Sequence, residues 1–205
     1  MEGYTTVKQG ATFEFEDRKS VFIADVLPVS TESEALAFVD SVRKRYPDAK
    51  HHVYAYVLRE NSIMRFSDDR EPQGTAGLPV LDCIRKGGYV DVAIVVTRYF
   101  GGVLLGTGGL VHAYTAAAQG AIKSAGDAKY DLYRRIEITV SYSDYQKITT
   151  AISESGFRVS NTFYKEDVVI EGSILSVNSA TLCASLVQLT AARVICKVGE
   201  EIFDC

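Results

Sequence analysis

The segment SDDREPQGTAGLP gathers acidic side chains that could bind a divalent cation. Asp68, Asp69 and Glu71 follow one another closely, and hard cations prefer clustered carboxylates. The same carboxylates could instead neutralise Arg98 or cap a helix that begins near Thr75. Because Asp68 and Asp69 are adjacent, an extended chain would point them in opposite directions. The two carboxylates could therefore bind one cation only if the chain turns at Asp68 and Asp69.

The second feature is TRYFGGVLLGTGGLVHAY, in which glycines separate a strand-like run from a helix-like run. A helix N-terminus attracts anions, and glycine lets a phosphate approach the backbone. The spacing matches neither a P-loop nor a dinucleotide-binding fingerprint. Leu104 and Leu105 indicate that this loop contacts the core. Tight backbone packing and an anion or RNA-phosphate contact, with a contribution from Arg98, both stay open.

Few other side chains suggest chemistry. Tyr99 and Phe100 precede the glycines and would either pack in the core or stack on bases. His112 follows Gly108 by about one helical turn and would face the loop. No serine, cysteine or threonine has a base partner at nucleophile spacing. The sequence therefore predicts no cofactor and no catalytic residue.

Composition narrows the class of protein. The chain has 205 residues, 47% of them hydrophobic, and a net charge of −4. An acidic protein does not bind nucleic acid through its overall field, and nothing indicates a reader of DNA sequence. No apolar run is long enough for a membrane span, and the N-terminus has no signal-peptide pattern. Four cysteines without metal-site spacing indicate reduced thiols and a cytoplasmic protein.

The elements around these features read as mixed α and β in the first half. ATFEFED and SVFIADVLPV predict neighbouring strands. A Thr31–Glu34 capping box opens a helix that Pro47 ends. HHVYAYVLRE and SIMRFS predict a strand pair, and a short helix is expected over residues 75–86. YVDVAIVVTRYF predicts a strand covered on both faces, and an alanine-rich helix follows the glycine loop.

The second half has the order β-α-β-β-α-β, which is that of a ferredoxin-like unit. DAKYDLYRR is the predicted linker, and Ser143 and Gln146 form the capping box of the first helix. The sequence thus predicts an α+β protein with domains at residues 1–128 and 134–205.

Three blocks, EPQGTAGLPVL, VAIVVTRYFGG and LGTGGLVHAY, together resemble the IMPACT family, including its bacterial YigZ-like members. The resemblance covers about residues 15–126. It implies that the first domain is similar to the second domain of ribosomal protein S5, and the second to the fifth domain of elongation factor G. It also implies a role in translational control, because eukaryotic members compete for a protein partner of the kinase that senses uncharged tRNA.

Three residues depart from the family pattern. Arg70 stands where glycine is usual, which implies that the turn after Asp69 does not require a positive φ. Gln73 replaces a small residue. His112 replaces an arginine and removes a permanent positive charge, although Arg70 would partly restore it if it lay near Arg98.

The leading hypothesis is a non-enzymatic protein that binds the ribosome, RNA or a translation-associated protein, without a membrane partner. The alternative is a metal-assisted hydrolase or phosphotransferase that uses Asp68, Asp69 and Glu71, and small-molecule kinases of the S5-like fold make it worth keeping. The predicted binding surface comprises Asp68, Asp69, Arg70, Glu71, Gly74, Thr75, Arg98, Tyr99, Phe100, Gly101, Gly102, Gly106, Gly108, Gly109 and His112.

Overall fold

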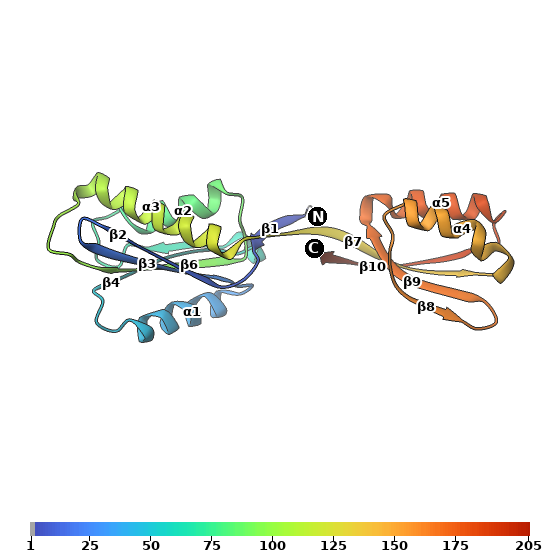
Figure 1. Ribbon diagram of the computed structural model, residues 1–205, viewed down its shortest axis with the longest axis horizontal. Helices are drawn as coiled ribbons and strands as arrows, with labels where there is room; N and C mark the ends of the chain where they lie inside the picture. Colours follow the sequence, from blue (N-terminus) through green and yellow to red (C-terminus); the bar gives the residue numbers. More distant parts are fainter. Residues whose placement is uncertain (1–2) are drawn as a thin grey trace. The chain divides into compact units, whose positions relative to one another are not determined.

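A computed structural model describes residues 3–205 and divides them into two compact units (Figure 1). The N-terminal unit comprises Tyr4–Lys129, and the C-terminal unit comprises Tyr130–Cys205 together with Gly3. Residues 1–2, with which the predicted first domain begins, lie outside the described residues. Both units combine helices with antiparallel strands, which confirms the α+β class.

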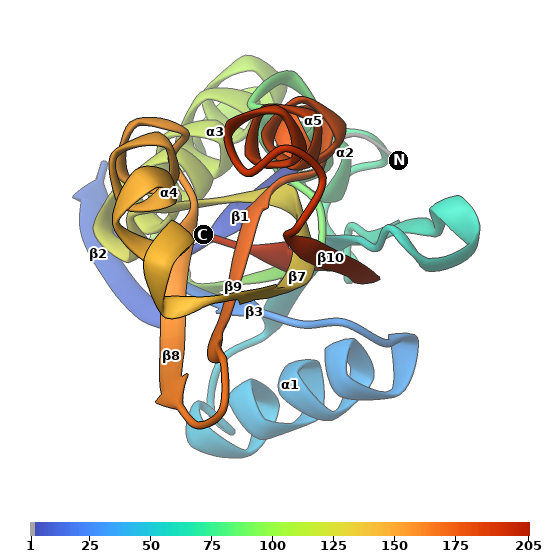
Figure 2. The ribbon, with the colours of Figure 1, turned by 90° about the vertical axis from the view of Figure 1, so that its right-hand side faces the viewer.

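The N-terminal unit contains, in chain order, β1 (Tyr4–Val7), β2 (Ala11–Asp17), β3 (Ser20–Pro28), α1 (Glu32–Arg45), β4 (His51–Val57), η1 (Glu60–Ser62), β5 (Met64–Ser67), α2 (Gly77–Lys86), β6 (Val92–Tyr99) and α3 (Gly106–Ala125). Five of the strands form an antiparallel sheet with the order β2-β3-β6-β4-β5. Helices α2 and α3 cover one face of this sheet, and α1 covers the other (Figures 1 and 2).

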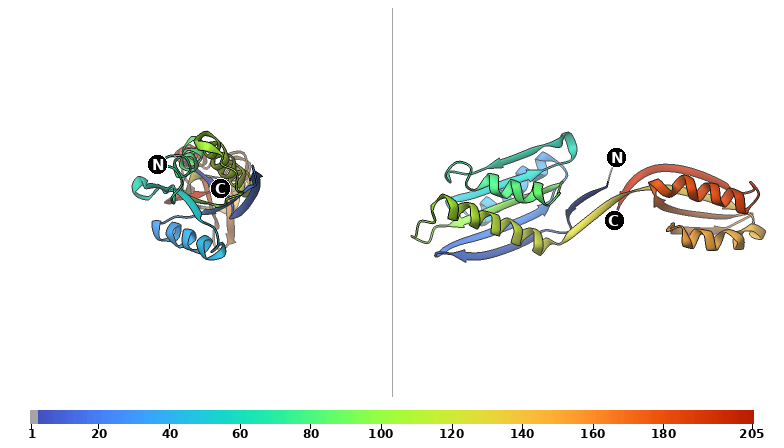
Figure 3. Two further views of the ribbon diagram at one scale, coloured as in Figure 1. Left: turned by 90° about the vertical axis from the view of Figure 1, so that its left-hand side faces the viewer. Right: turned by 90° about the horizontal axis from the view of Figure 1, so that it is seen from above.

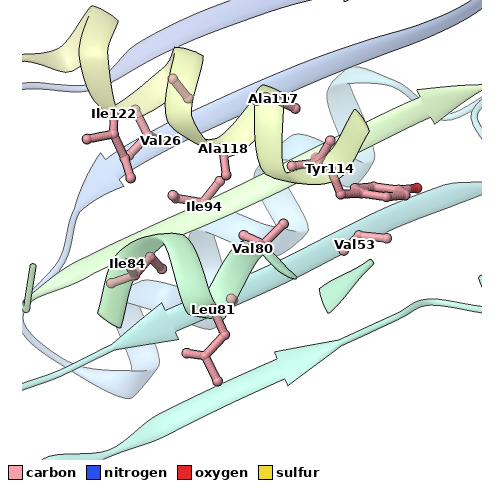
Figure 4. Close-up of a cluster of buried hydrophobic side chains, with 14 of the residues drawn as sticks. Val26, Val53, Val80, Leu81, Ile84, Ile94, Tyr114, Ala117, Ala118 and Ile122 are labelled. Carbon is pink, nitrogen blue, oxygen red and sulfur yellow. The ribbon is translucent and has the colours of Figure 1, made fainter. Parts of the chain in front are cut away.

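Strand β6 is buried along nearly its whole length, as the sequence predicted, because helices cover both faces of the sheet. Figure 4 shows Ile94 of β6 beneath Ala118 of α3, with Val80 and Ile84 of α2 beside it. All four side chains are fully enclosed. This apolar layer fixes the positions of the loop before α2 and the loop before α3.

Local sequence signals set the ends of α1. The Thr31 hydroxyl accepts a bond of 3.2 Å from the Glu34 N–H, and the Glu34 carboxylate accepts one of 3.3 Å from the Thr31 N–H. The predicted capping box is therefore confirmed, and the helix ends at Arg45, just before Pro47. The predicted pairing of the two following strands is confirmed as β4 with β5.

The chain continues with β7 (Asp127–Val140), which begins in the N-terminal unit. The other elements of the C-terminal unit are α4 (Tyr142–Glu154), β8 (Arg158–Tyr164), β9 (Val168–Leu175), η2 (Ser176–Asn178), α5 (Ser179–Leu189) and β10 (Ile195–Asp204). Its strands are antiparallel in the order β10-β7-β9-β8. Helices α4 and α5 lie side by side on one face (Figure 3). This is the predicted ferredoxin-like arrangement. The likeness to ribosomal protein S5 stays a prediction.

The boundary between the two units falls between Lys129 and Tyr130, inside the predicted linker DAKYDLYRR. This segment is not irregular but forms the first part of β7, because residues 131–134 pair with β10. One local prediction in this half is wrong. The Ser143–Gln146 capping box does not form. Helix α4 begins earlier, after Ser141, and the Ser143 hydroxyl lies 3.0 Å from that of Ser141.

Candidate functional site

Asp68 caps helix α2 from the preceding loop. One carboxylate oxygen accepts bonds from the backbone N–H groups of Gly77 at 2.8 Å and Ala76 at 3.1 Å, and the other accepts from Gly74 at 2.9 Å. The Thr75 hydroxyl donates to the Pro72 carbonyl at 2.7 Å. Asp68 thus satisfies free N–H groups at a helix start, which is one of the roles that the sequence left open.

Asp69 serves a different partner. Its carboxylate accepts a bond of 2.7 Å from the His52 N–H, and its carbonyl lies 2.9 Å from the His51 ring nitrogen Nδ1. Both contacts attach the loop to the start of β4. The two adjacent aspartates therefore act on opposite sides of the chain.

Glu71 and Arg98 form an ion pair that is almost closed to solvent. The guanidinium donates to the Glu71 carboxylate at 2.7 Å, and the two side chains are 6% and 4% exposed. The Tyr114 hydroxyl donates to the same carboxylate oxygen at 2.7 Å. Burial, followed by the Glu71 charge, holds the pKa of Tyr114 well above its usual range. Three segments far apart in sequence thus converge on one carboxylate.

Arg98 faces inward and is not available as a surface cation. The remaining contacts of its guanidinium run to the Ser20 hydroxyl, at 3.4 Å, and over the rings of Phe22 and Phe100. Ser20 also accepts a bond of 3.2 Å from the Gly101 N–H. The expectation that Arg98 supplies an anion contact does not fit this geometry, because its charge is already used by Glu71.

The turn after Asp69 also differs from expectation. Arg70 has a φ of +70° and Asp69 one of +39°, so the left-handed backbone persists although arginine stands at the usual glycine position. The Asp69 contacts with β4 and a bond of 2.9 Å from the Glu71 N–H to the Asp68 carbonyl hold the turn in place. The Arg70 side chain is exposed and reaches the Lys50 carbonyl at 3.0 Å, and no contact with Arg98 is found among residues 3–205.

The glycines of the second loop have distinct roles. A Cβ on Gly101 would lie 2.0 Å from the Lys19 backbone, so this position packs too closely for any side chain. Gly102 and Gly106 have φ values of +82° and +73°. A Cβ on Gly108 would meet open space. Close packing explains Gly101, whereas the first turn of α3 at Gly108 is open to solvent.

The tip of this loop is apolar and exposed. Leu104 is 82% exposed, Phe100 52% and Val103 41%. Leu105 is buried, so only one of the two leucines contacts the core as predicted. Tyr99 is half-buried, Gly109 packs on Leu105, and His112 is exposed on α3. We call the exposed residues the loop surface: Phe100, Gly102, Val103, Leu104, Gly106, Thr107, Gly108 and His112.

Sequence reasoning missed residues of the β2–β3 hairpin. Arg18 and Lys19 form its tip with φ values of +46° and +65°, and the Lys19 backbone is the one that abuts Gly101. Two basic residues in a turn that normally takes asparagine and glycine were the available signal. The roles of Ser20 and Tyr114 had no signal in the sequence, because each depends on a partner more than forty positions away.

The carboxylates do not form the shared site that a metal-assisted enzyme needs. Asp68 binds the start of α2, Asp69 binds β4, and Glu71 binds Arg98 and Tyr114. Across residues 3–205, no group of three histidine, cysteine, aspartate or glutamate side chains is placed to hold a metal ion. The metal-assisted alternative therefore lacks its ligand set. In the same residues, no helix is long and apolar enough to cross a membrane.

The site thus comprises two loops of an α+β domain that internal hydrogen bonds and an ion pair hold in place, and the second loop ends in an exposed apolar tip. Comparison with known families agrees with the predicted resemblance: residues 18–122 match the Impact N-terminal domain, and residues 138–193 match a domain of unknown function, DUF1949. The chain belongs to the IMPACT family.

Similar proteins cover nearly the whole chain. The IMPACT family member YvyE of Bacillus subtilis (strain 168) is 35% identical over 98% of this chain and 93% of its own length. The IMPACT family member YigZ of Escherichia coli (strain K12) is 31% identical over 98% of this chain and 100% of its own length. Protein IMPACT of Xenopus laevis is 32% identical, but over 44% of this chain and 30% of its length.

A solved structure is similar over both units. The crystal structure of a hypothetical protein shares 30% sequence identity and covers 96% of this chain and 97% of its own, with a TM-score of 0.62.

Proposed function

We propose that this chain is a non-enzymatic binding protein of translation, and that the loop surface contacts the ribosome. Membership of the IMPACT family supports the link to translational control that the sequence resemblance implies. The proposal includes the ribosome as partner and, with it, a cytoplasmic location.

One observation carries the assignment of the surface. The buried Glu71–Arg98 pair, with Tyr114 and Ser20, fixes the base of a loop whose tip exposes Leu104 and Phe100. Exposed apolar residues on a rigidly held loop are typical of interaction sites. The charges beneath them are neutralised internally. Contact through this surface would therefore use apolar side chains and the open backbone of α3 at Gly108.

The charges near the loop surface predict how strongly its association with RNA would depend on salt concentration. The chain is acidic overall, and His112 stands where the family usually has arginine. Lys19 of the adjacent hairpin has its backbone against Gly101, and the basic residue Arg18 precedes it. With two such charges, association with RNA phosphates would weaken only modestly as salt rises.

The test is co-sedimentation with ribosomes from the protein's own cells at low and moderate salt. Leu104→Ser removes the most exposed side chain of the tip. Val177→Ser is the matched control, because Val177 is 84% exposed in the C-terminal unit against 82% for Leu104. We expect wild type and Val177→Ser to sediment with ribosomes and Leu104→Ser to lose most of the association.

Two results would overturn the proposal in different ways. Absence of wild-type protein from the ribosome fraction at both salts would reject the ribosome as partner. Equal sedimentation of Leu104→Ser and Val177→Ser would reject the loop surface. If a pull-down captures protein partners that survive nuclease and depend on Leu104, the surface is right and its partner is a translation-associated protein.

A further inference from the structure

Two cysteines of the C-terminal unit lie on elements that contact each other. Cys183 is in α5 and Cys196 is in β10, and both are free, half-buried thiols. They pack against the same apolar core, which contains Ile138 of β7. Cys83 packs against the core of the N-terminal unit instead, and Cys205 is exposed. Among residues 3–205, Cys183 and Cys196 are therefore the two cysteines that share a core.

The register of β10 turns the Cys196 side chain toward the helices. Cys196 lies opposite Ile138 of β7, and residues opposite each other in a sheet project from the same face. Ile138 is completely buried in the core to which α4 and α5 contribute. The neighbours of Cys196 in β10, Ile195 and Lys197, are exposed and project from the other face. The Cys196 thiol thus lies beneath the helix layer.

Cys183 lies on the flank of α5 that faces away from α4. Thr181 and Ser185 line a small cavity that α5 shares with α4. Because successive helical residues are rotated by about 100°, Cys183 lies roughly 160° around the helix from each of them. Helix α4 itself packs toward β8, since Tyr145 and Val159 line a cavity between the two. In the sheet order β10-β7-β9-β8, the flank of α5 that carries Cys183 therefore lies toward β10.

The protonation of Cys196 reflects the closeness of the two thiols. Burial raises the pKa of Cys196 to about 12, and the charge of Cys183 and a hydrogen bond with Cys183 act in the same direction. The last two effects require neighbouring sulfur atoms. Cysteines on packed elements whose side chains point toward each other can be bridged without a large backbone movement.

We propose that Cys183 and Cys196 form a reversible disulfide when the protein is exposed to a peroxide. The bridge would fasten α5 to β10. It encloses residues 184–195, which include the whole connection between these two elements. A bridge of this kind restrains the unfolded chain and thereby stabilises the folded one. The site belongs to the C-terminal unit and is independent of the loop surface and of the proposed contact with the ribosome.

The oxidation takes two steps. The Cys183 thiolate attacks one oxygen of hydrogen peroxide, so that an S–O bond forms, the O–O bond breaks and hydroxide leaves. Cys183 reacts first because Cys196 keeps its proton at neutral pH. The Cys196 sulfur then attacks the Cys183 sulfur, so that an S–S bond forms, the S–O bond breaks and hydroxide leaves again. The two thiol protons convert both hydroxides to water, and the peroxide gains the two electrons that the cysteines lose.

Trypsin separates the two cysteines and provides a direct assay. It cleaves after lysine and arginine, which places Cys183 in residues 166–193 and Cys196 in residues 194–197. The full-length protein would be treated with hydrogen peroxide, its remaining thiols blocked with iodoacetamide, and the denatured chain digested. We expect mass spectrometry to find the two peptides joined, and dithiothreitol to separate them. We also expect the C-terminal unit of the oxidised protein to melt at least about 5 °C higher than that of the reduced protein.

Single variants separate the roles of the two thiols. Cys196→Ala is expected to leave a sulfenic acid on Cys183, which dimedone would label. Cys183→Ala is expected to make Cys196 at least fivefold less oxidised than in the wild type, because the Cys196 thiol keeps its proton. Cys83→Ala is the matched control, since Cys83 is also a half-buried cysteine, and this variant should form the disulfide as the wild type does. Melting temperatures of the reduced variants check that each one folds.

Three results would overturn the proposal. Absence of the joined peptides under conditions that oxidise the exposed Cys205 would reject the disulfide. Bridges from Cys183 to Cys205, or between molecules, in amounts equal to the bridge from Cys183 to Cys196 would show that the fold does not favour this pair. An oxidised protein that melts no higher than the reduced one would reject the fastening of α5 to β10.

Discussion

Arg98 and Glu71 show how a residue pair that looks functional in sequence acts as an internal brace in the fold. The two charges are removed from water together and pair with each other, and Tyr114 and Ser20 add hydrogen bonds. The buried Nε of Arg98 has no hydrogen-bond partner among residues 3–205. Removing one partner would leave the other charge buried without compensation, which is far more costly than losing an exposed pair. The main consequence of mutating this pair is therefore on stability.

Arg98→Ala is expected to lower the free energy of unfolding of the N-terminal unit by about 3–5 kcal/mol. Arg85→Ala is the control, because the Arg85–Asp82 pair is 54% and 36% exposed and contributes about 0–1 kcal/mol. Urea unfolding, monitored through the hydrogen exchange of the β6 amides, measures the loss of unfolding free energy in both variants. A loss for Arg98→Ala no greater than for Arg85→Ala would show that the brace is not needed.

Tyr114 gives a prediction about alkaline pH. Burial and Glu71 raise the pKa of Tyr114 in the folded state, whereas an unfolded tyrosine ionises near pH 10. The stability from this group is complete below about pH 10 and falls as pH rises, by up to about 1.4 kcal/mol per pH unit. Unfolding free energies of wild type and Tyr114→Phe between pH 9 and 11 should therefore converge. Parallel curves would contradict the shift.

At the scale of elements, the loop before α2 carries backbone strain that the sequence did not indicate. Arg70 adopts a positive φ where glycine would do so freely, and Asp68 holds the start of the helix from the same loop. A left-handed residue other than glycine costs roughly 1–2 kcal/mol. The turn persists because contacts on both sides of it stabilise the left-handed backbone by more than its strain costs.

Arg70→Gly is expected to be more stable than Arg70→Ala by about 1 kcal/mol, because glycine relieves the strain. The comparison with alanine isolates the backbone effect, since both variants lose the side-chain contact with the Lys50 carbonyl. Thermal unfolding of the two variants provides the measurement. Equal melting temperatures would mean that the left-handed turn costs nothing here.

Asp144, in the first turn of α4, is joined to Arg193 in the segment between α5 and β10. Hydrogen bonds from Arg193, and then from Lys147, hold the pKa of the Asp144 carboxyl well below its usual range. Because the folded pKa is depressed, the stability that this group adds is present above about pH 4 and is lost as pH falls below it.

In Asp144→Asn, the unfolding free energy of the C-terminal unit should therefore depend less on pH between about pH 4 and 2 than it does in the wild type. Asp204→Asn serves as the control, because the Arg158–Asp204 pair is about half exposed at 47% and 45%. Circular dichroism over this range makes the comparison. A steep acid transition that survives in Asp144→Asn would assign it to other carboxylates.

At the scale of the whole molecule, each unit has its own core. Ile94 belongs to a cluster drawn from the N-terminal unit, and Ile138 to one drawn from the C-terminal unit. Strand β7 begins in the first unit and continues into the second. The family domains follow the same division, with matches at residues 18–122 and 138–193.

Ile138→Ala is expected to destabilise the C-terminal unit by about 2–5 kcal/mol, because it leaves a cavity in a fully buried position. Hydrogen exchange should accelerate in β9 and α5 and stay unchanged in β6. Ile94→Ala is the reciprocal variant and should produce the opposite pattern. Equal acceleration in both units from either variant would show that they unfold as one.

The sequence by itself determined the family, the α+β class and most elements, because hydrophobic periodicity and the Thr31–Glu34 cap are local signals. The strand conformation of the linker was not expected and the second capping box was wrong, because the pairing of β7 with β10 and the position of Ser141 depend on tertiary contacts. Only the tertiary structure decided the roles of the site residues. It separated Asp68, Asp69 and Glu71 onto different partners, turned Arg98 inward and left Leu104 exposed. Each of these outcomes depends on which distant groups meet in space, and residue type and spacing do not contain that information.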